Sequence, residues 1–282
     1  MSDSFQSSTV EKEISDGVWQ VTLSSPGDLN ALSSQMRQSI LYSLDRVHEQ
    51  GGRVAIVRGD ARAFSSGYRL DPGVMRPSSV VEDRARLVGV TNFMSAYREH
   101  PVVTIAEVRG HCLAGGTDLM IASDLSIAAD TASIGVPNVR DLGITMLLPL
   151  WSWLIGPHRA KLLTLSGDIF SGAEAAEWGL ITASLPEDAL GARVRSIAER
   201  IALMPTEMLQ VVKHALNTAW DTAGIHTTLL RAAELDTIAH STESVGGFWE
   251  LVVEDGMRAA LDRRKSRYAG VRVLDLLTID NS

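Results

Sequence analysis

Apolar and polar residues are arranged along the first two-thirds of the chain in a pattern that predicts alternating strands and helices. Short apolar runs at residues 53–59, 102–108 and 124–130 are typical of strands buried in a parallel sheet. Residues 33–50 carry apolar side chains at helical spacing, and residues 81–97 also predict a helix. Because helices alternate with apolar strands, we expect right-handed crossovers and a largely parallel α/β core.

Local turn and capping signals divide this pattern into elements. Asp16 and Gly17 form a two-residue hairpin signal between two short strands. Ser33 or Ser34 can cap the helix that Gly51 ends. Farther along, Ser171 and Glu174 have the spacing of a capping box, which predicts another helix start.

Beyond residue 186 the pattern becomes helical almost throughout. The predicted helices cover residues 190–203, 206–219, 227–240 and 255–267. The first dozen residues are rich in serine and are expected to be frayed. We therefore expect four segments: a disordered N-terminus over 1–12, an α/β core over 13–200, a helical region over 201–268 and a tail over 269–282.

Composition narrows the class of protein. The chain has 282 residues, 45% of them apolar, and a formal net charge of −8, which argues against a nucleic-acid partner. Its one cysteine, Cys112, rules out an intrachain disulfide, and no Cys/His spacing resembles a metal site. The N-terminus lacks the pattern of a signal peptide, and no apolar run reaches about 18 residues. We expect a cytoplasmic protein without a membrane or metal partner.

The stretch 110–124, GHCLAGGTDLMIASD, predicts the reactive part of the molecule. It runs from a buried strand through Gly115 and Gly116 into a helix. The first amides of a helix have no intrahelical partner, and glycine lets a ligand approach them closely. Such a turn suits an anion or a developing oxyanion, and Asp118 projects near the same helix end.

Several motifs in order resemble one family. They lie at residues 26–32 (PGDLNAL), 54–70, 110–130, 134–144, 155–181 and 255–268. Together they resemble the enoyl-CoA hydratase/isomerase, or crotonase, superfamily over roughly residues 10–268. The resemblance implies an α/β fold of the ClpP/crotonase type, a spiral of ββα units with a helical C-terminal trimerisation region. It also implies a homotrimer or a dimer of trimers.

The same resemblance implies the chemistry of the site. The substrate would be a thioester that itself carries coenzyme A, with no permanently bound cofactor. Backbone amides of Tyr68 and Gly115 would hold the thioester oxygen and stabilise an enolate. Relatives place two glutamates where this chain has Asp118 and Asn138. Since an asparagine cannot exchange a proton at neutral pH, Asp118 is the expected main acid/base, and Asp141 could replace the second acid if its loop turns inward.

Substrate-binding positions follow by the same resemblance. The residues expected to contact the CoA ester are Asp28, Leu29, Asn30, Ala31, Ser66, Gly67, Tyr68, Arg69, Leu70, Gly116, Arg264 and Lys265. Arg264 and Lys265 belong to a basic cluster that is alternatively a solvated helix end.

Three functions remain open from the sequence. The first is enoyl-CoA hydratase or isomerase chemistry with Asp118 as acid/base. The second is a specialised crotonase, such as a decarboxylase, a thioester hydrolase or a C–C bond-cleaving enzyme, which needs only the oxyanion hole. The third is a non-catalytic CoA-ester-binding subunit, for which Asp118 would only complement the helix dipole.

Overall fold

The computed structural model describes residues 8–59, 62–70 and 79–277. Ten strands form two sheets in this part of the chain. The larger sheet has the order β1-β2-β3-β5-β7-β10, and the smaller has the order β4-β6-β8-β9. The larger comprises β1 (Thr9–Ser15), β2 (Val18–Leu23), β3 (Val54–Arg58), β5 (Val103–Val108), β7 (Leu125–Ala129) and β10 (Ala183–Leu185). The smaller comprises β4 (Ala63–Ser65), β6 (His111–Leu113), β8 (Ser133–Gly135) and β9 (Ile169–Ser171).

The strand pairing confirms a largely parallel core. In the larger sheet only the hairpin of β1 and β2 is antiparallel, and in the smaller sheet only β8 and β9 are. A strand of the larger sheet is followed by a short strand of the smaller sheet and then by a helix, as in β3–β4–α3 and β5–β6–α4. These are the predicted ββα units.

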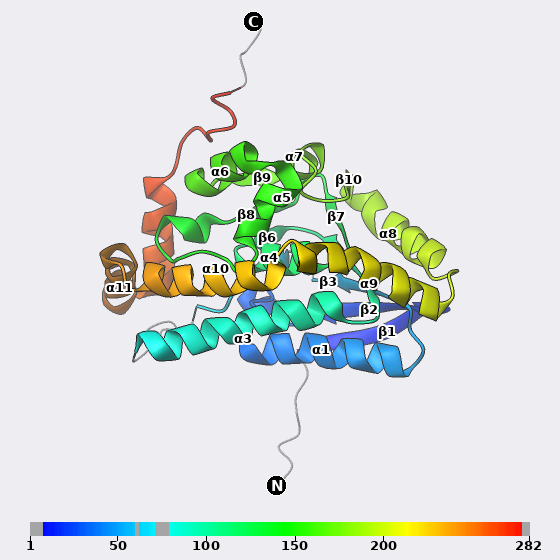
Figure 1. Ribbon diagram of the computed structural model, residues 1–282. Helices are drawn as coiled ribbons and strands as arrows, with labels where there is room; N and C mark the ends of the chain where they lie inside the picture. The colour runs from blue at the N-terminus through cyan, green and yellow to red at the C-terminus, as the bar shows by residue number, and fades with distance from the viewer. Residues whose placement is uncertain (1–7, 60–61, 71–78, 278–282) are drawn as a thin grey trace, which may run out of the picture.

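Helices surround the sheets, and the C-terminal ones wrap across them (Figure 1). They are α1 (Ser34–Glu49), α3 (Val80–Glu99), α4 (Gly115–Ala122), α5 (Trp151–Ile155), α6 (Pro157–Ser166), α7 (Gly172–Glu177), α8 (Glu187–Ile201), α9 (Thr206–Thr222), α10 (Ile225–His240) and α11 (Glu243–Arg267). Three 3-10 helices are η1 (Pro26–Asp28), η2 (Pro137–Arg140) and η3 (Leu148–Leu150). In Figure 1, α10 runs along α3, and the two helices are packed against each other.

The capping signals form as predicted. The Ser33 hydroxyl accepts a hydrogen bond from the Met36 amide at 3.1 Å and starts α1. Ser171 and Glu174 make both bonds of a capping box at the start of α7. Each is a local interaction, so a few neighbouring residues suffice to specify it.

Two boundaries differ from the expectations. Strand β1 begins at Thr9 and pairs with β2, so the predicted disorder does not extend to residue 12; residues 1–7 lie outside the described part. Helix α11 covers Glu243–Arg267 but is interrupted at Gly256, whose φ of 86° is not helical, so the predicted helix over 255–267 is its second half and the first half was not predicted. Glycine is a poor helix former and hides the first half of α11 in the sequence, whereas packing of Phe248 and Trp249 stabilises it in the fold.

One large apolar core fills the space between the sheets and helices, and a smaller cluster lies beneath α11. The smaller cluster includes Leu142, next to the loop that carries Asn138 and Asp141. Within the described residues, no helix is long and apolar enough to cross a membrane.

Candidate active site

The two glycine-containing loops predicted to hold the thioester lie against each other. Gly67 has a φ of 105°, and a Cβ there would come 3.0 Å from the Gly115 amide nitrogen. The ring of Tyr68 covers Gly115, where a Cβ would lie 2.7 Å from the ring atom Cε2. A Cβ at either position would clash with the facing loop, so glycine permits this close contact.

The amides of Tyr68 and Gly115 donate no hydrogen bond to any residue within the described part of the chain. Gly115 is the first residue of α4, where the helix dipole is positive. Ala114, directly before it, has a positive φ of 50°, a strained value for a residue with a Cβ. The turn therefore presents unpaired backbone donors, as an oxyanion site needs.

Asp118 is fully buried, and its carboxylate is already hydrogen-bonded. The Tyr68 hydroxyl donates to Oδ2 at 2.6 Å. The Met146 amide donates to Oδ2 at 2.9 Å and the Leu147 amide to Oδ1 at 3.0 Å. Asp118 thus ties the start of α4 to the loop before η3, and its carboxylate lies behind the Tyr68 hydroxyl.

Burial controls the protonation of this pair. It raises the pKa of Asp118 from 3.8 to about 7, although the hydrogen bonds from Tyr68, Leu147 and Met146 lower it. Burial and the nearby Asp118 charge raise the pKa of Tyr68 well above 10. The carboxyl group therefore changes charge near neutral pH, whereas the tyrosine keeps its proton.

Asn138 and Asp141, the other predicted catalytic positions, have different surroundings. The Asn138 amide donates from Nδ2 to the Gly143 carbonyl at 3.0 Å. Its Oδ1 is buried and has no partner among the described residues. The Asp141 carboxylate pairs with Arg264 at 3.0 Å. Asp141 therefore forms an ion pair with Arg264 of α11 and is not hydrogen-bonded to Asp118.

The predicted CoA-binding segments 28–31 and 66–70 lie together. The Ser66 amide donates to the Leu29 carbonyl at 2.9 Å, and its hydroxyl donates to the Asp28 carbonyl at 3.1 Å. Leu29 and Asn30 take left-handed backbone conformations, which turn the loop sharply. Arg69 is exposed and pairs with Asp28 at 3.2 Å. These loops form one continuous surface beside Tyr68.

The basic cluster is only partly available. The Arg264 guanidinium lies over the Phe248 ring while it pairs with Asp141, whereas Lys265 is exposed. Both remain predicted CoA-binding residues.

Two cavities meet at Tyr68 and Arg86. The larger has a volume of about 260 Å³ and is lined by Leu32, Ser33, Ser34, Gln35, Arg37, Tyr68, Arg69, Arg86 and Val90. The smaller has about 40 Å³ and is lined by Tyr68, Leu70, Arg86, Leu87, Ala114, Asn138, Leu142, Ile144, Asp236 and His240. The smaller cavity thus joins the residue before Gly115 to a group of charged residues on α3 and α10.

Sequence reasoning did not identify that group. Nδ1 of His240 lies 2.7 Å from Oδ2 of Asp83, whose Oδ1 accepts a hydrogen bond from Arg86 at 2.6 Å. Asp236 accepts a hydrogen bond from the Ile144 amide at 2.6 Å. The sequence does contain two polar pairs at helical spacing on predicted helices, Asp83 with Arg86 and Asp236 with His240. Nothing local shows that these two helices pack together.

His240 and the two carboxylates Asp83 and Asp236 shift one another's pKa values. Burial lowers the pKa of His240, but its hydrogen bond with Asp83 and the charges of Asp236 and Asp83 outweigh burial and raise it overall. Burial raises the pKa of Asp236 from 3.8 to about 6, against the lowering effect of His240. Burial raises the pKa of Asp83, but the hydrogen bonds from His240 and Arg86 outweigh burial and lower it overall. Asp236, whose pKa is about 6, and His240, whose pKa is raised, therefore both line the small cavity.

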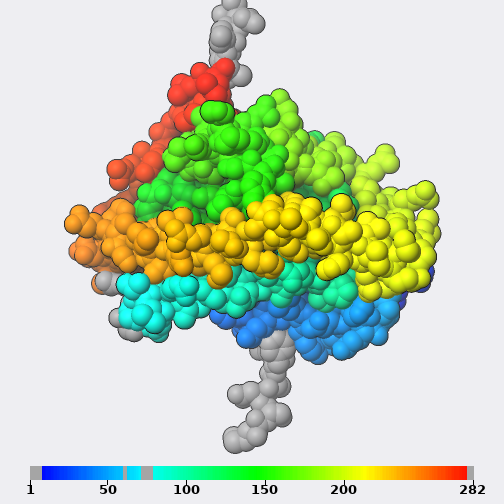
Figure 2. Space-filling model, viewed as in Figure 1, coloured from blue at the N-terminus to red at the C-terminus, as the bar shows by residue number. Residues whose placement is uncertain are grey.

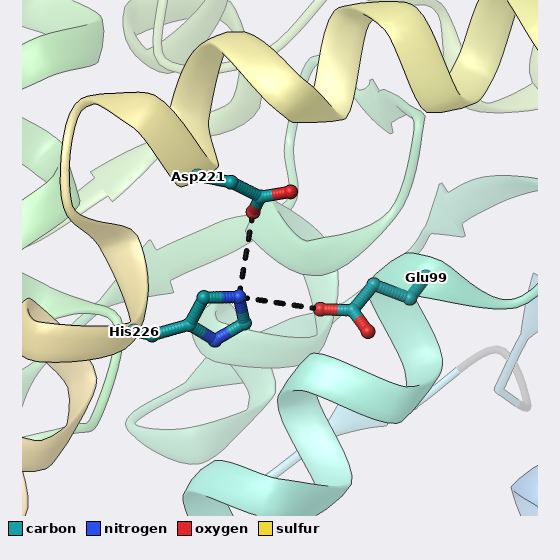
Figure 3. Close-up of side chains that lie close together, drawn as sticks. All are labelled: Glu99, Asp221 and His226. Atoms are coloured by element: carbon teal, nitrogen blue, oxygen red, sulfur yellow. Dashed lines mark ion pairs between the residues drawn. The ribbon is translucent and has the colours of Figure 1, made fainter.

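A separate cluster of Glu99, Asp221 and His226 has the spacing of a metal site, and its side chains converge in Figure 3. Nε2 of His226 lies 3.8 Å from Glu99 Oε1 and 3.6 Å from Asp221 Oδ1. Arg98 already donates to these same two oxygens, at 3.1 Å and 2.6 Å. A divalent cation would face a guanidinium at contact distance, so these residues do not fit a metal ion.

Comparison with known proteins gives consistent similarities. A family model described as enoyl-CoA hydratase/isomerase matches residues 13–270. The 4-chlorobenzoyl coenzyme A dehalogenase-2 of an Arthrobacter species is 30% identical over 219 residues, covering 73% of this chain and 77% of that protein. A probable enoyl-CoA hydratase of Mycobacterium tuberculosis is 28% identical over 271 residues, covering 94% and 98%.

Among solved structures, an enoyl-CoA hydratase/isomerase from Xanthobacter autotrophicus Py2 is similar with a TM-score of 0.84 and 33% identity. The match covers 94% of this chain and 99% of that one. This likeness confirms the predicted α/β fold with a helical C-terminal region.

Proposed function

The chain belongs to the enoyl-CoA hydratase/isomerase (crotonase) family, and we propose that it converts an acyl-CoA thioester through an enolate. The Tyr68 and Gly115 amides hold the thioester oxygen of that enolate. The observation that carries the proposal is a pair of amides that have no acceptor among the described residues. They lie on two glycine loops in contact, one of them at a helix N-terminus. Removing one donor of such a site typically costs about 10²–10³ in rate.

Asp118 acts on the substrate through Tyr68. The Asp118 carboxylate accepts hydrogen bonds from the Tyr68 hydroxyl and from two amides, and among the described residues Tyr68, not Asp118, lines the cavities. Tyr68 is therefore the member of the pair placed to contact the substrate. The phenol oxygen takes a proton from the α-carbon while its own proton moves to Asp118. The electron pair left on carbon moves onto the thioester oxygen, and the reverse transfer delivers a proton to carbon.

The two cavities give the substrate its place. The 260 Å³ cavity beside the CoA-binding loops is large enough for several non-hydrogen atoms of the ester, and Tyr68 lies between it and the small cavity. Arg37, Arg69 and Arg86 make its wall basic. The phosphates of CoA bind farther out, at Arg264 and Lys265. This placement supports hydration or isomerisation of an enoyl-CoA, with chemistry at the carbons next to Tyr68.

Exchange of the α-proton of butyryl-CoA for deuterium tests enolate formation without assuming the full reaction. Wild type should exchange the proton, and Tyr68→Phe and Asp118→Asn should lose at least about 10²-fold in rate while still binding the ester. Tyr97→Phe is the control, because Tyr97 is fully buried and its hydroxyl bonds to Ser123 at 2.9 Å, outside both cavities. Unchanged exchange in Asp118→Asn would contradict the assigned pair.

A parallel screen of enoyl-, dienoyl- and β-ketoacyl-CoAs identifies the reaction. Turnover of an enoyl- or dienoyl-CoA fits the proposal. Exchange combined with turnover of β-ketoacyl-CoAs alone would favour a specialised crotonase, and absence of both would favour a CoA-ester-binding subunit.

We further propose that the chain assembles as a trimer, or a dimer of trimers, through α9 and α10. These helices cross one face of the molecule as the yellow and orange band in Figure 2. A groove of about 340 Å³ with a largely apolar lining runs beside α9. Exposed apolar side chains on the two helices are Met208, Val211, Val212, Leu216, Leu230, Leu235 and Ile238. Exposed apolar side chains gathered beside an apolar groove are typical of a subunit contact.

Light scattering coupled to size-exclusion chromatography measures the assembly. Leu216→Lys should shift the protein toward the monomer mass. Val253→Lys is the control, since Val253 is equally exposed but lies on α11. A monomeric wild type would refute the proposed assembly.

A further inference from the structure

We propose that His240, oriented by Asp83 and assisted by Asp236, is a second acid/base group of the acyl-CoA site and activates a water molecule held in the small cavity. The inference rests on the proposed enolate chemistry and extends it from the α-carbon to the β-carbon. It assigns to α10 the role that a second carboxylate has where this chain carries Asn138.

The geometry of His240 is that of an oriented base. Its Nδ1 lies 2.7 Å from Asp83 Oδ2, and Arg86 in turn holds the other oxygen of Asp83. This arrangement orients the ring and favours one tautomer of the neutral imidazole, in which Nδ1 carries the proton and Nε2 has the free lone pair. Nε2 lies 3.6 Å from Asp236 Oδ2, beyond hydrogen-bond range.

The cavity can hold the water that this base requires. Its volume of about 40 Å³ exceeds what one water molecule needs. Its wall includes His240, Asp236, Tyr68 and Asn138, and the buried Oδ1 of Asn138 lacks a partner among the described residues. A water there can donate to Asn138 Oδ1 and to His240 Nε2, which satisfies an otherwise unpaired buried acceptor.

The step balances with these groups alone. Nε2 of His240 takes one proton of the water as the oxygen forms a bond to the β-carbon of the enoyl-CoA. The π electrons move to the thioester oxygen at the Tyr68 and Gly115 amides. When the enolate collapses, the α-carbon receives the Tyr68 proton, and Asp118, protonated at the start, restores the phenol. His240 then releases its proton to solvent, directly or through Asp236, and Asp118 regains one.

Charged groups face His240 from each side. Asp83 and Arg86 come from α3, Asp236 from its own helix, and Tyr68 from the loop after β4. The loop after β8 contributes the uncharged Asn138, and its Asp141 is engaged with Arg264 from α11. Asp83 and Asp236 favour the imidazolium and Arg86 opposes it, with a net upward shift of the His240 pKa. Water activation should therefore increase as pH rises through the His240 pKa, above its ordinary 6.5.

The alternative is that the cluster only fastens α10 to α3. Such a role predicts equal loss of every activity together with lower stability. A base role predicts loss of water addition alone. The discriminating pair is His240→Gln and the matched control His100→Gln. His100 is also buried and lies 3.3 Å from a carboxylate oxygen of Asp45, but it lines neither cavity of the site.

The experiment measures two rates for each protein. One is hydration of crotonyl-CoA, and the other is α-deuterium exchange of butyryl-CoA, which reports on the proposed function alone. His240→Gln should lose about 10²–10⁴-fold in kcat for hydration, with KM and exchange within about threefold of wild type. His100→Gln should match wild type in both. Asp83→Asn, which removes only the orienting charge, should keep measurable hydration with a lowered kinetic pKa.

Other results overturn the inference in distinguishable ways. Equal loss of hydration and exchange in His240→Gln, or loss of neither, refutes the base role while wild-type exchange leaves the enolate proposal intact. Wild-type exchange without hydration refutes it as well. A wild type that neither exchanges nor hydrates refutes both proposals.

Discussion

The protonation of Asp118 can be measured through stability, without knowing the substrate. The perturbation is Asp118→Asn, which removes the titrating group but keeps its size. Asp118 is fully buried, and burial raises the pKa of its carboxyl group from 3.8 to about 7. The folded protein therefore binds a proton here over a pH range in which the unfolded chain does not.

The magnitude follows from linkage. Because the folded pKa is raised, the stabilising contribution is complete below pH 3.8 and is lost as pH rises through about 7. Each pKa unit corresponds to 1.36 kcal/mol, so the part lost between pH 5 and pH 8 amounts to about 3 kcal/mol. The whole range from 3.8 would give about 4 kcal/mol.

The assay is urea unfolding of wild type and Asp118→Asn at pH 5, 6, 7 and 8. Subtracting the two free energies of unfolding removes contributions that both proteins share, including that of Asp236. We expect the advantage of wild type over the variant to shrink by about 3 kcal/mol from pH 5 to pH 8. Leu119→Ala is the control, since it removes buried apolar atoms beside Asp118 and costs about 3 kcal/mol at every pH. An advantage that does not change with pH would refute the reasoning and show that Asp118 is ionised throughout this range.

Substitutions at four further positions test the site loops and the surrounding fold, each by urea unfolding. Ala114→Gly should stabilise the protein by about 1 kcal/mol, because it removes a Cβ held at a φ of 50°; destabilisation would contradict the assigned strain. Gly67→Ala should destabilise it by at least about 2 kcal/mol and reduce α-proton exchange, since the new Cβ would lie 2.8 Å from the Leu113 carbonyl oxygen; normal exchange would show that the two loops can separate. Ser171→Ala should cost about 1 kcal/mol through loss of the cap of α7, whereas Ser171→Thr should cost less. Lys213→Met should cost about 3 kcal/mol by leaving Asp124 without the ammonium that lies 2.7 Å away, and a neutral result would mean that the Thr104 bonds satisfy Asp124 alone.

The parts of the fold that were predictable from sequence depend on short-range information. The Ser33 and Ser171 caps and the Asp16-Gly17 hairpin each involve residues a few positions apart. The contact between Gly67 and Gly115 came from the family resemblance, because nothing in either loop alone specifies the other. The structure adds a physical reason, which is that each position lacks room for a Cβ.

The sequence could not predict the features of the site that depend on packing between distant segments. Whether Asp118 faces solvent or is sealed depends on Met146 and Leu147, which lie 28 and 29 residues away. Asp83 and His240 are separated by 157 positions and meet only because α10 packs along α3. Helical periodicity places each of them on a helix, but it does not say which two helices are neighbours.

The neutral residue at position 138 is consistent with this packing. Asp236 and Asp83 are buried beside the small cavity, and Asp118 lies behind its Tyr68 wall. Asp83 is balanced by Arg86 and His240, whereas Asp118 has no cation within hydrogen-bond range among the described residues. Another carboxylate at 138 would add a like charge in a poorly solvated space and raise the pKa of each acid further. An asparagine avoids that cost and still offers a buried oxygen to a water or a substrate hydroxyl. The neutral amide at position 138 therefore suits a cavity that is already bordered by the charged residues of α3 and α10.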